Sequence, residues 1–385
     1  MDGFTFDTVP TIICEAGALK RIGTLAAERI GRRVLIVTDR GLASSAIVTD
    51  ALKSLEAAGV APFVFDAVTA DPAASIVQAA ADMAREARVE GIIGLGGGSS
   101  MDVAKLAALI APGSQPLEAL YGVDKAVGKR LPLMLVPTTA GTGSEVTPIA
   151  IVTTGHHQKM GVSSRLIIPD VALLDPVVTI GLPKAITAAT GLDAMVHAIE
   201  AYTSISPRNN PLSRMLSETA IRLLASNLRR AVDHGEDVEA RGAMLLGAML
   251  AGQAFANSPV GAVHALAYPV GSRFGVPHGM SNAVVLLQVM RFNRSACAPG
   301  YAALAPFAFP HLAGLGQAEQ VDGLIDGLAG LMRQTAIPST LGEVGIVAAD
   351  VNDLANDAMA QTRLLQNNPR NMTYNDARAI YRAAL

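Results

Sequence analysis

The sequence predicts an α/β N-terminal domain built on a parallel sheet, followed by an all-α C-terminal domain. The chain has 385 residues, of which 50% are hydrophobic and 16% are charged, a length and composition that suit two globular domains. Through the first half, apolar β-branched runs alternate with helix-like segments, and this alternation is typical of parallel strand pairing. After Pro183, convincing strand runs become scarce. We therefore expect one domain over residues 1–184 and a second over residues 185–385.

Six short apolar runs of the first half are strand candidates. The run at residues 33–38 is rich in Val and Ile and ends at the polar Asp39, as expected of a strand buried on both faces. The others are residues 60–65, 91–95, 131–136, 149–153 and 171–175. Segments rich in Ala, Leu, Met, Arg and Glu favour helix. These segments are residues 48–58, 73–87, 186–203, 212–233, 238–256 and 321–333. Ligands of open α/β sheets bind at the carboxyl ends of the strands, so we expect the site there, in a cleft between the two halves.

Charge and cysteine content argue against several classes of partner. The formal net charge is -3 and no block of Lys and Arg stands out, which disfavours nucleic acid and anionic membranes as partners. The first residues do not resemble a signal peptide, and the chain has no uninterrupted apolar run of about 18 residues, so we expect no membrane span. Cys14 and Cys297 lie too far apart for a CxxC site, and we expect reduced thiols in the cytoplasm.

Two glycine-rich loops follow strand candidates. The first, at residues 94–105, leads into a helical pattern, and its residues of interest are Gly97, Gly98 and Ser99. Glycine lets the backbone approach an anion closely, and the first N–H groups of a helix then point at that anion. The second, at residues 136–145, places four hydroxyl residues near glycines: Thr138, Thr139, Thr142 and Ser144. Each loop alone is compatible with simple turn or cap chemistry, but two such loops favour a dinucleotide or a sugar phosphate.

Asp39 ends the strand candidate at residues 33–38. A carboxylate in this position accepts hydrogen bonds from ribose hydroxyls and repels a 2′-phosphate, which favours NAD over NADP. An ordinary turn aspartate is the alternative interpretation.

One aspartate and three histidines are candidate metal ligands. Asp193 and His197 are four residues apart in a segment of helical composition, so a helix places them on one face. His264 and His278 lie in apolar contexts near glycines. One carboxylate with three imidazoles suits divalent Fe or Zn and leaves a position open for substrate. A simple hydrogen bond between Asp193 and His197 is the alternative, because spacing alone does not bring the four residues together.

At these residues the chain resembles the iron-containing (group III) alcohol dehydrogenase family over nearly its whole length. The motifs that carry the resemblance are residues 96–99 with Asp102 and Lys105, and residues 137–145, 191–197, 261–271, 277–282 and 368–373. The resemblance implies the fold that this family shares with dehydroquinate synthase. That fold has a Rossmann-like N-terminal domain, a helical C-terminal domain and a metal between them.

The resemblance also implies a reaction and its site residues. The reaction is NAD-dependent hydride transfer between a small primary or secondary alcohol and its aldehyde or ketone, with Fe(II) or Zn(II) as Lewis acid on the substrate oxygen. The implied metal ligands are Asp193, His197, His264 and His278. The implied cofactor-binding residues are Asp39 at the adenosine ribose, Lys159 near the nicotinamide ribose, and Gly97, Gly98, Ser99, Asp102, Thr138, Thr139 and Thr142. Phe255 is implied at the border of the substrate pocket.

Tyr268 departs from the family pattern, in which many members have a second histidine that helps to move a proton. A tyrosine, with an unperturbed pKa of about 10, is a poorer relay at neutral pH. We consider Tyr268 a candidate catalytic residue, with a packing role as the alternative. Two related functions stay open: an oxo-acid reductase similar to maleylacetate reductase, and a non-redox lyase similar to dehydroquinate synthase. The family is often dimeric, so we expect a homodimer or higher homo-oligomer.

Overall fold

The computed structural model describes residues 3–155 and 159–385. The chain divides into two compact units. The first in sequence, the α/β unit, comprises residues 7–139 and 143–180. The other, the helical unit, comprises residues 181–385 together with the short segments 3–6 and 140–142 of the described residues.

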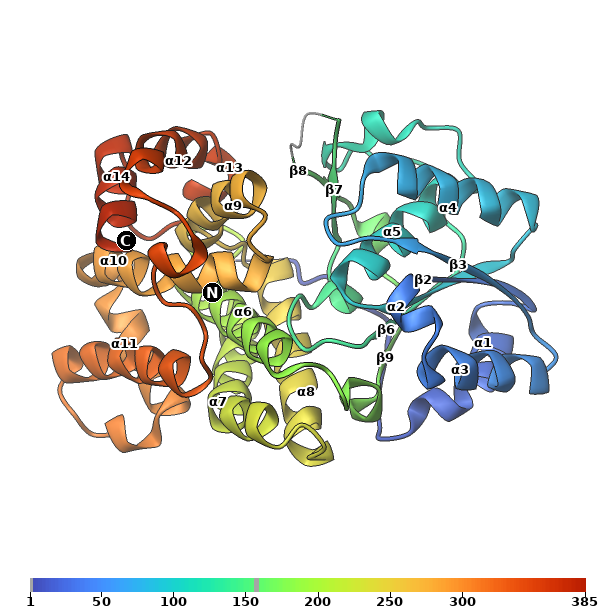
Figure 1. Cartoon of the computed structure of the whole chain (residues 1–385), viewed down its shortest axis with the longest axis horizontal. Coiled ribbons are helices and arrows are strands. Elements are labelled where there is room, and N and C mark those ends of the chain that lie inside the picture. The colour runs from blue at the N-terminus through green and yellow to red at the C-terminus, as the bar shows by residue number, and fades with distance from the viewer. Residues whose placement is uncertain (1–2, 156–158) are drawn as a thin grey trace. The chain divides into compact units, whose positions relative to one another are not determined.

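The α/β unit is built on a six-stranded sheet whose neighbouring strands are all parallel (Figure 1). In sheet order the strands are β1 (Thr11–Cys14), β9 (Val171–Leu174), β6 (Leu133–Pro137), β4 (Gly91–Gly96), β2 (Arg33–Asp39) and β3 (Ala61–Val68). This sheet confirms the predicted parallel, Rossmann-like class. Five of the six strand candidates form strands of this sheet, whereas β1 is not predicted, because it is short and its residues alternate between half-buried and exposed.

Helices cover both faces of this sheet. On one face α1 (Ile22–Arg29) and α3 (Ala46–Ala57) pack with Val34 and Ile36. On the opposite face α4 (Ala74–Glu86) and α5 (Gly98–Ile110) pack with Leu35 and Val37. Successive side chains of a strand point to opposite faces, so the continuous apolar run of β2 supplies both cores.

The strand order reverses between β2 and β4, since β3 lies on one side of β2 and β4, β6 and β9 lie on the other. Doubly wound sheets bind ligands outside the carboxyl ends of the strands at such a point. The topology therefore singles out the ends of β2, β4 and β6, where Asp39 and the two glycine-rich loops begin.

A second sheet belongs to the same unit. It contains β5 (Gly122–Val123), β8 (Lys159–Ser163) and β7 (Ile149–Thr153), with β7 and β8 antiparallel. The strand predicted at residues 149–153 thus forms, although outside the main sheet. Residues 156–158, which connect β7 to β8, lie outside the described residues.

The helical unit contains no strand among its described residues (Figure 1). Its helices are α6 (Lys184–Thr203), α7 (Pro211–Asp233), α8 (Val238–Asn257), α9 (Ala262–Phe274), α10 (His278–Ala308), α11 (Gln317–Gln334), α12 (Val351–Met359), α13 (Thr362–Leu365) and α14 (Tyr374–Ala383). Helix α6 is buried from Thr187 to Ala201 except at Thr190, so it forms the centre of the unit. Of the helices that the structure describes, none is long and apolar enough to cross a lipid bilayer.

The sequence patterns predict neither α9 nor α10. Helix α9 contains Pro269, and α10 contains Pro299 and Pro306, all of which disfavour a helix interior. Helix α10 accommodates Pro299 at a kink two residues earlier, where Cys297 has non-helical dihedral angles (φ -128, ψ 25). Burial of both helices in the large core of the unit outweighs the local preference.

Candidate metal centre and cofactor loops

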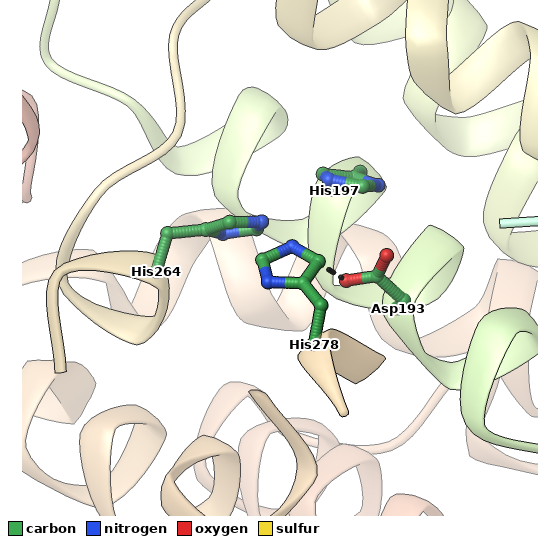
Figure 2. A group of neighbouring side chains, drawn as sticks. All are labelled: Asp193, His197, His264 and His278. Carbon is green, nitrogen blue, oxygen red and sulfur yellow. Dashed lines mark ion pairs between the residues drawn. The ribbon is translucent and has the colours of Figure 1, made fainter. Parts of the chain in front are cut away.

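Asp193, His197, His264 and His278 lie together in the helical unit. One potential ligand atom from each residue can be chosen so that all four lie within 4.8 Å of one another. Figure 2 shows the four side chains converging from three segments of the chain. His278 Nε2 lies 3.6 Å from Asp193 Oδ1, the contact that the dashed line of Figure 2 marks. The candidate ligands that the sequence spreads over 86 positions are therefore one cluster in space.

Three helices place the four side chains. Asp193 and His197 are one turn apart on α6, as their spacing predicts. His264 lies in the first turn of α9, and His278 is the first residue of α10. The start of α10 approaches α6 so closely that a Cβ on Gly279 would lie 2.4 Å from the backbone oxygen of Ala189. Gly279 thus lets His278 reach Asp193.

The electrostatics of the cluster favour an ionised Asp193 carboxylate and an uncharged His197 imidazole. Burial lowers the pKa of His197 to about 3, against the opposing attraction of Asp193. Burial would raise the pKa of Asp193, but the nearby histidines and the hydrogen bond from Asn282 lower it overall. The burial of His264 lowers its pKa, yet the hydrogen bond and charge of Glu200, together with Asp193, raise it overall.

Two polar residues that the sequence interpretation missed contact the cluster. Glu200 Oε2 lies 2.6 Å from His264 Nδ1, and both groups are buried. Asn282 donates a hydrogen bond of 2.6 Å from Nδ2 to Asp193 Oδ1, and its Oδ1 has no partner among the described residues. Helical spacing was the available signal, because Glu200 follows His197 by three positions and Asn282 follows His278 by four.

The two candidate pocket residues border the cluster. The Phe255 ring stacks on His197 with ring centroids 4.4 Å apart. Tyr268 lies edge-on to His264 at 6.4 Å and is tilted against His278 at 6.0 Å. Both aromatic side chains are half-buried, and His278 keeps 33% of its side chain exposed. The exposed part of the cluster is thus on the side of His278.

The donor set fits a divalent cation. Imidazole nitrogen and carboxylate oxygen are the ligands of Zn(II) and of non-haem Fe(II), at about 2.0–2.2 Å from the ion. Four such atoms around one ion lie at most about 4.4 Å apart, close to the spread observed here. The buried Asp193 carboxylate also requires compensation, and Asn282 alone supplies only a neutral donor.

Several predicted cofactor residues meet at the carboxyl ends of β2, β4 and β6. Asp39 ends β2, where its Oδ1 accepts a hydrogen bond from the Leu42 backbone N–H at 3.0 Å. Gly97 precedes α5 as its N-cap and provides no side-chain cap, and Gly98 and Ser99 form the first turn. Thr138 continues β6, since its N–H donates to the Gly96 backbone oxygen at 3.0 Å. Thr139 follows it, beside Gly97. The bare first turn of α5 leaves N–H donors for an anion.

The remaining predicted cofactor residues lie elsewhere. Asp102 is held within the protein: its Oδ1 accepts from Ser144 Oγ at 2.6 Å and its Oδ2 from the Ile151 N–H at 2.9 Å. Lys159 donates from Nζ to Asp71 Oδ1 at 2.7 Å. Thr142 belongs to the helical unit, with residues 140–142.

Comparisons with known proteins agree over most of the chain. A family model described as iron-containing alcohol dehydrogenase matches residues 10–176, and the model of the Fe-containing alcohol dehydrogenase family, C-terminal, matches residues 187–385. The chain is 38% identical to long-chain-alcohol dehydrogenase 1 of Geobacillus thermodenitrificans, covering 93% of this chain and 91% of that protein. It is 33% identical to the NAD-dependent methanol dehydrogenase of Bacillus methanolicus, covering 98% of each. A crystal structure of 1,3-propanediol oxidoreductase superposes with a TM-score of 0.96 at 32% identity, covering 100% of both chains.

Proposed function

The chain belongs to the iron-containing alcohol dehydrogenase family, and we propose that Asp193, His197, His264 and His278 hold its metal. Membership of the family makes the protein an NAD-dependent oxidoreductase that acts on CH–OH groups. The single observation that supports the ligand assignment is the convergence of one buried carboxylate and three imidazoles on one point. When bound there, Fe(II) or Zn(II) supplies Lewis acidity toward the substrate oxygen.

The chain's own residues would hold and orient the reactants. The half-buried Phe255, stacked on His197, offers an apolar surface for the carbon chain of a small alcohol or aldehyde. Tyr268 lies beside His264 and His278, where its hydroxyl can exchange a proton with a substrate oxygen or a water molecule. These roles make Phe255 a positioning residue and Tyr268 the candidate proton carrier.

The ends of β2, β4 and β6 would hold NAD. The bare first turn of α5, at Gly97, Gly98 and Ser99, supplies backbone N–H donors for the pyrophosphate. The hydroxyls of Thr138 and Thr139 follow at the end of the adjacent strand. We also assign Asp102, Thr142 and Lys159 to the cofactor site, with Asp102 shaping the start of α5 from within the protein rather than by direct contact.

Asp39 would accept hydrogen bonds from the adenosine ribose and exclude NADP. Asp39→Gly removes the carboxylate that would repel a 2′-phosphate, so kcat/KM with NADPH should rise relative to NADH by roughly 10-fold or more. Steady-state kinetics with both cofactors measure the ratio. An unchanged ratio would remove Asp39 from the ribose site.

Metal removal tests the proposed function directly. Protein purified without oxygen should contain about one Fe or Zn per chain, and stripping it should abolish aldehyde-dependent NADH oxidation. Adding back Fe(II) or Zn(II) should restore the activity. Full activity of the stripped protein would refute the metal assignment.

A panel of small primary and secondary alcohols, aldehydes and oxo acids then identifies the substrate. Preference for an oxo acid would favour the reductase alternative.

We also propose that the protein works as a homodimer in the cytoplasm. Strand β1 is an edge strand of the main sheet, with Ile12 38% exposed, and an edge of this kind can pair with a second copy. Cys14 and Cys297 are both free thiols, in keeping with a reducing compartment. Light scattering should give twice the chain mass of 39.7 kDa, and a mass of one chain would exclude the dimer.

A further inference from the structure

Glu200 is buried on the same helix as two of the proposed ligands, and the reaction described above gives it no role. It lies near the C-terminal end of α6, one turn after His197. A carboxylate that is only 7% exposed needs donors for its oxygens, and both oxygens of Glu200 find them on α9.

The first contact sets the orientation of an imidazole. Glu200 Oε2 lies 2.6 Å from His264 Nδ1. A carboxylate is only an acceptor, so the proton of a neutral ring is held on Nδ1 and the lone pair is left on Nε2. That Nε2 faces the cluster, since it lies 3.3 Å from the Asn282 amide nitrogen that also contacts Asp193. The contact thus selects the tautomer that a metal requires.

The second contact caps the helix that carries the same histidine. Gly261 is the N-cap residue of α9 and has no side chain to satisfy the first N–H groups. Glu200 Oε1 accepts from the Val263 N–H at 2.7 Å and replaces the missing cap. One carboxylate therefore fixes both the start of α9 and the ring orientation of His264.

Asn367 and Asn368, the second of which opens the C-terminal motif at residues 368–373, contact the start of α9. Asn367 donates from Nδ2 to the Val260 backbone oxygen at 3.0 Å. A Cβ on Gly261 would lie 3.3 Å from Asn368 Cα, so Asn368 packs directly against the N-cap. Asn368 and Asn293 exchange two side-chain hydrogen bonds of 2.8 Å. All three asparagines are buried, and their hydrogen bonds and packing help to fix the position of the start of α9.

We propose that Glu200 is the positioning residue of the metal centre, holding His264 in the tautomer and orientation that present Nε2 to the cation. This inference rests on the proposed function, because it presumes that the four-residue cluster binds a metal. Carboxylates that orient a ligating histidine in this way are worth roughly 10- to 100-fold in metal affinity.

The test measures Zn(II) binding to the full-length metal-free protein by competition with a chromophoric chelator. Glu200→Gln keeps the shape of the side chain but replaces one acceptor oxygen by a donor, and we expect roughly 10- to 100-fold weaker binding. Glu319→Gln is the matched control, because Glu319 also caps a helix, accepting from the Gly316 N–H at 2.9 Å, but lies on the exposed α11 surface. Its Zn(II) affinity should equal that of the unsubstituted protein.

The outcomes separate this inference from the proposed function. If the unsubstituted protein binds no Zn(II), the proposed function fails. If it binds Zn(II) and Glu200→Gln binds equally well, Glu200 is only a helix cap and the inference is overturned. A lower unfolding temperature of the metal-free variant without loss of affinity would have the same meaning.

If Glu200→Gln does not fold, the tautomer of His264 can be measured in the unsubstituted protein instead. The protein is labelled with nitrogen-15 at its histidines, loaded with Zn(II) and studied by NMR. We expect His264 to carry its proton on Nδ1 and to bind through Nε2. The opposite tautomer would overturn the inference.

Discussion

Two buried clusters among the described residues, that of Lys105 in the α/β unit and that of Asp193 in the helical unit, differ in how their polar atoms are satisfied. In the α/β unit, the fully buried Lys105 donates from Nζ to Ser144 Oγ at 2.8 Å, Thr147 Oγ1 at 3.1 Å and the Ile149 oxygen at 2.8 Å. The ammonium has three protons and three acceptors. Asp102 lies 4.0 Å away and supplies the opposite charge.

The cluster of the helical unit is made mainly of acceptors. The Asp193 carboxylate and three imidazoles face one another, with the Asn282 amide as a neutral donor among them. The His197 and His264 rings are stacked, with centroids 4.8 Å apart. The Lys105 cluster therefore satisfies its polar atoms within the protein, whereas the Asp193 carboxylate and its imidazoles have the donor set that suits a cation.

The largest effect should follow from removing one acceptor from the helical cluster. Asp193→Asn keeps the volume but removes the only anionic ligand. We expect loss of bound metal and a fall in kcat/KM on the order of 10³-fold, because the cation contributes several kcal/mol to the transition state. Metal analysis and steady-state kinetics measure both. An Asp193→Asn variant that retains its metal and most of its activity would contradict the proposed site.

The matching change in the other cluster should affect stability and leave the metal in place. Lys105→Met leaves Ser144, Thr147 and Ile149 without their buried donor and Asp102 without its cation. We expect a loss of about 3–5 kcal/mol in the free energy of unfolding. Urea unfolding gives this value, and metal content per folded chain should stay at that of the unsubstituted protein. Loss of metal in this variant would show that the two clusters are not independent.

A smaller effect should appear in the pH dependence of stability through Glu145. Burial raises the pKa of this carboxyl to about 7, despite its own backbone hydrogen bond and the attraction of Lys105. A carboxyl with a raised folded pKa binds more protons when folded, so stability falls as pH rises from about 4.5 to 7. Glu145→Gln cannot lose a proton. Relative to that of the unsubstituted protein, its free energy of unfolding should therefore rise across this range by about 3 kcal/mol, at about 1.4 kcal/mol per pKa unit. If the free energies of unfolding of the two proteins change with pH in parallel, Glu145 does not have a raised pKa.

Much of the fold follows from sequence patterns, and the exceptions have local causes. The buried parallel strands are continuous apolar runs, and α6, α7 and α8 are rich in helix-forming residues, so local pattern and tertiary structure agree. Helices α9 and α10 contain prolines, and their stability comes from packing in the helical core. Strand β1 has only four residues, and it forms by pairing with β9, a strand more than 150 positions away in the sequence.

The candidate site divides in the same way. Asp193, His197, His264 and His278 stand out in the sequence because charged or imidazole side chains are rare in apolar, glycine-containing segments. Glu200 and Lys105 can be placed on helices from the sequence, but their partners cannot. Their donors and acceptors lie 39 to 64 positions away, and no local pattern records such pairs.

The alternation of strands and helices, the glycine-rich loops at the strand ends and the types of ligand available all follow from the order of residues in the chain. These properties depend on neighbouring residues, which the chain order displays. Only the tertiary structure decided which distant polar groups satisfy one another. Burial removes water as a partner, so each buried group depends on whichever side chain or backbone group the packing brings within hydrogen-bonding distance.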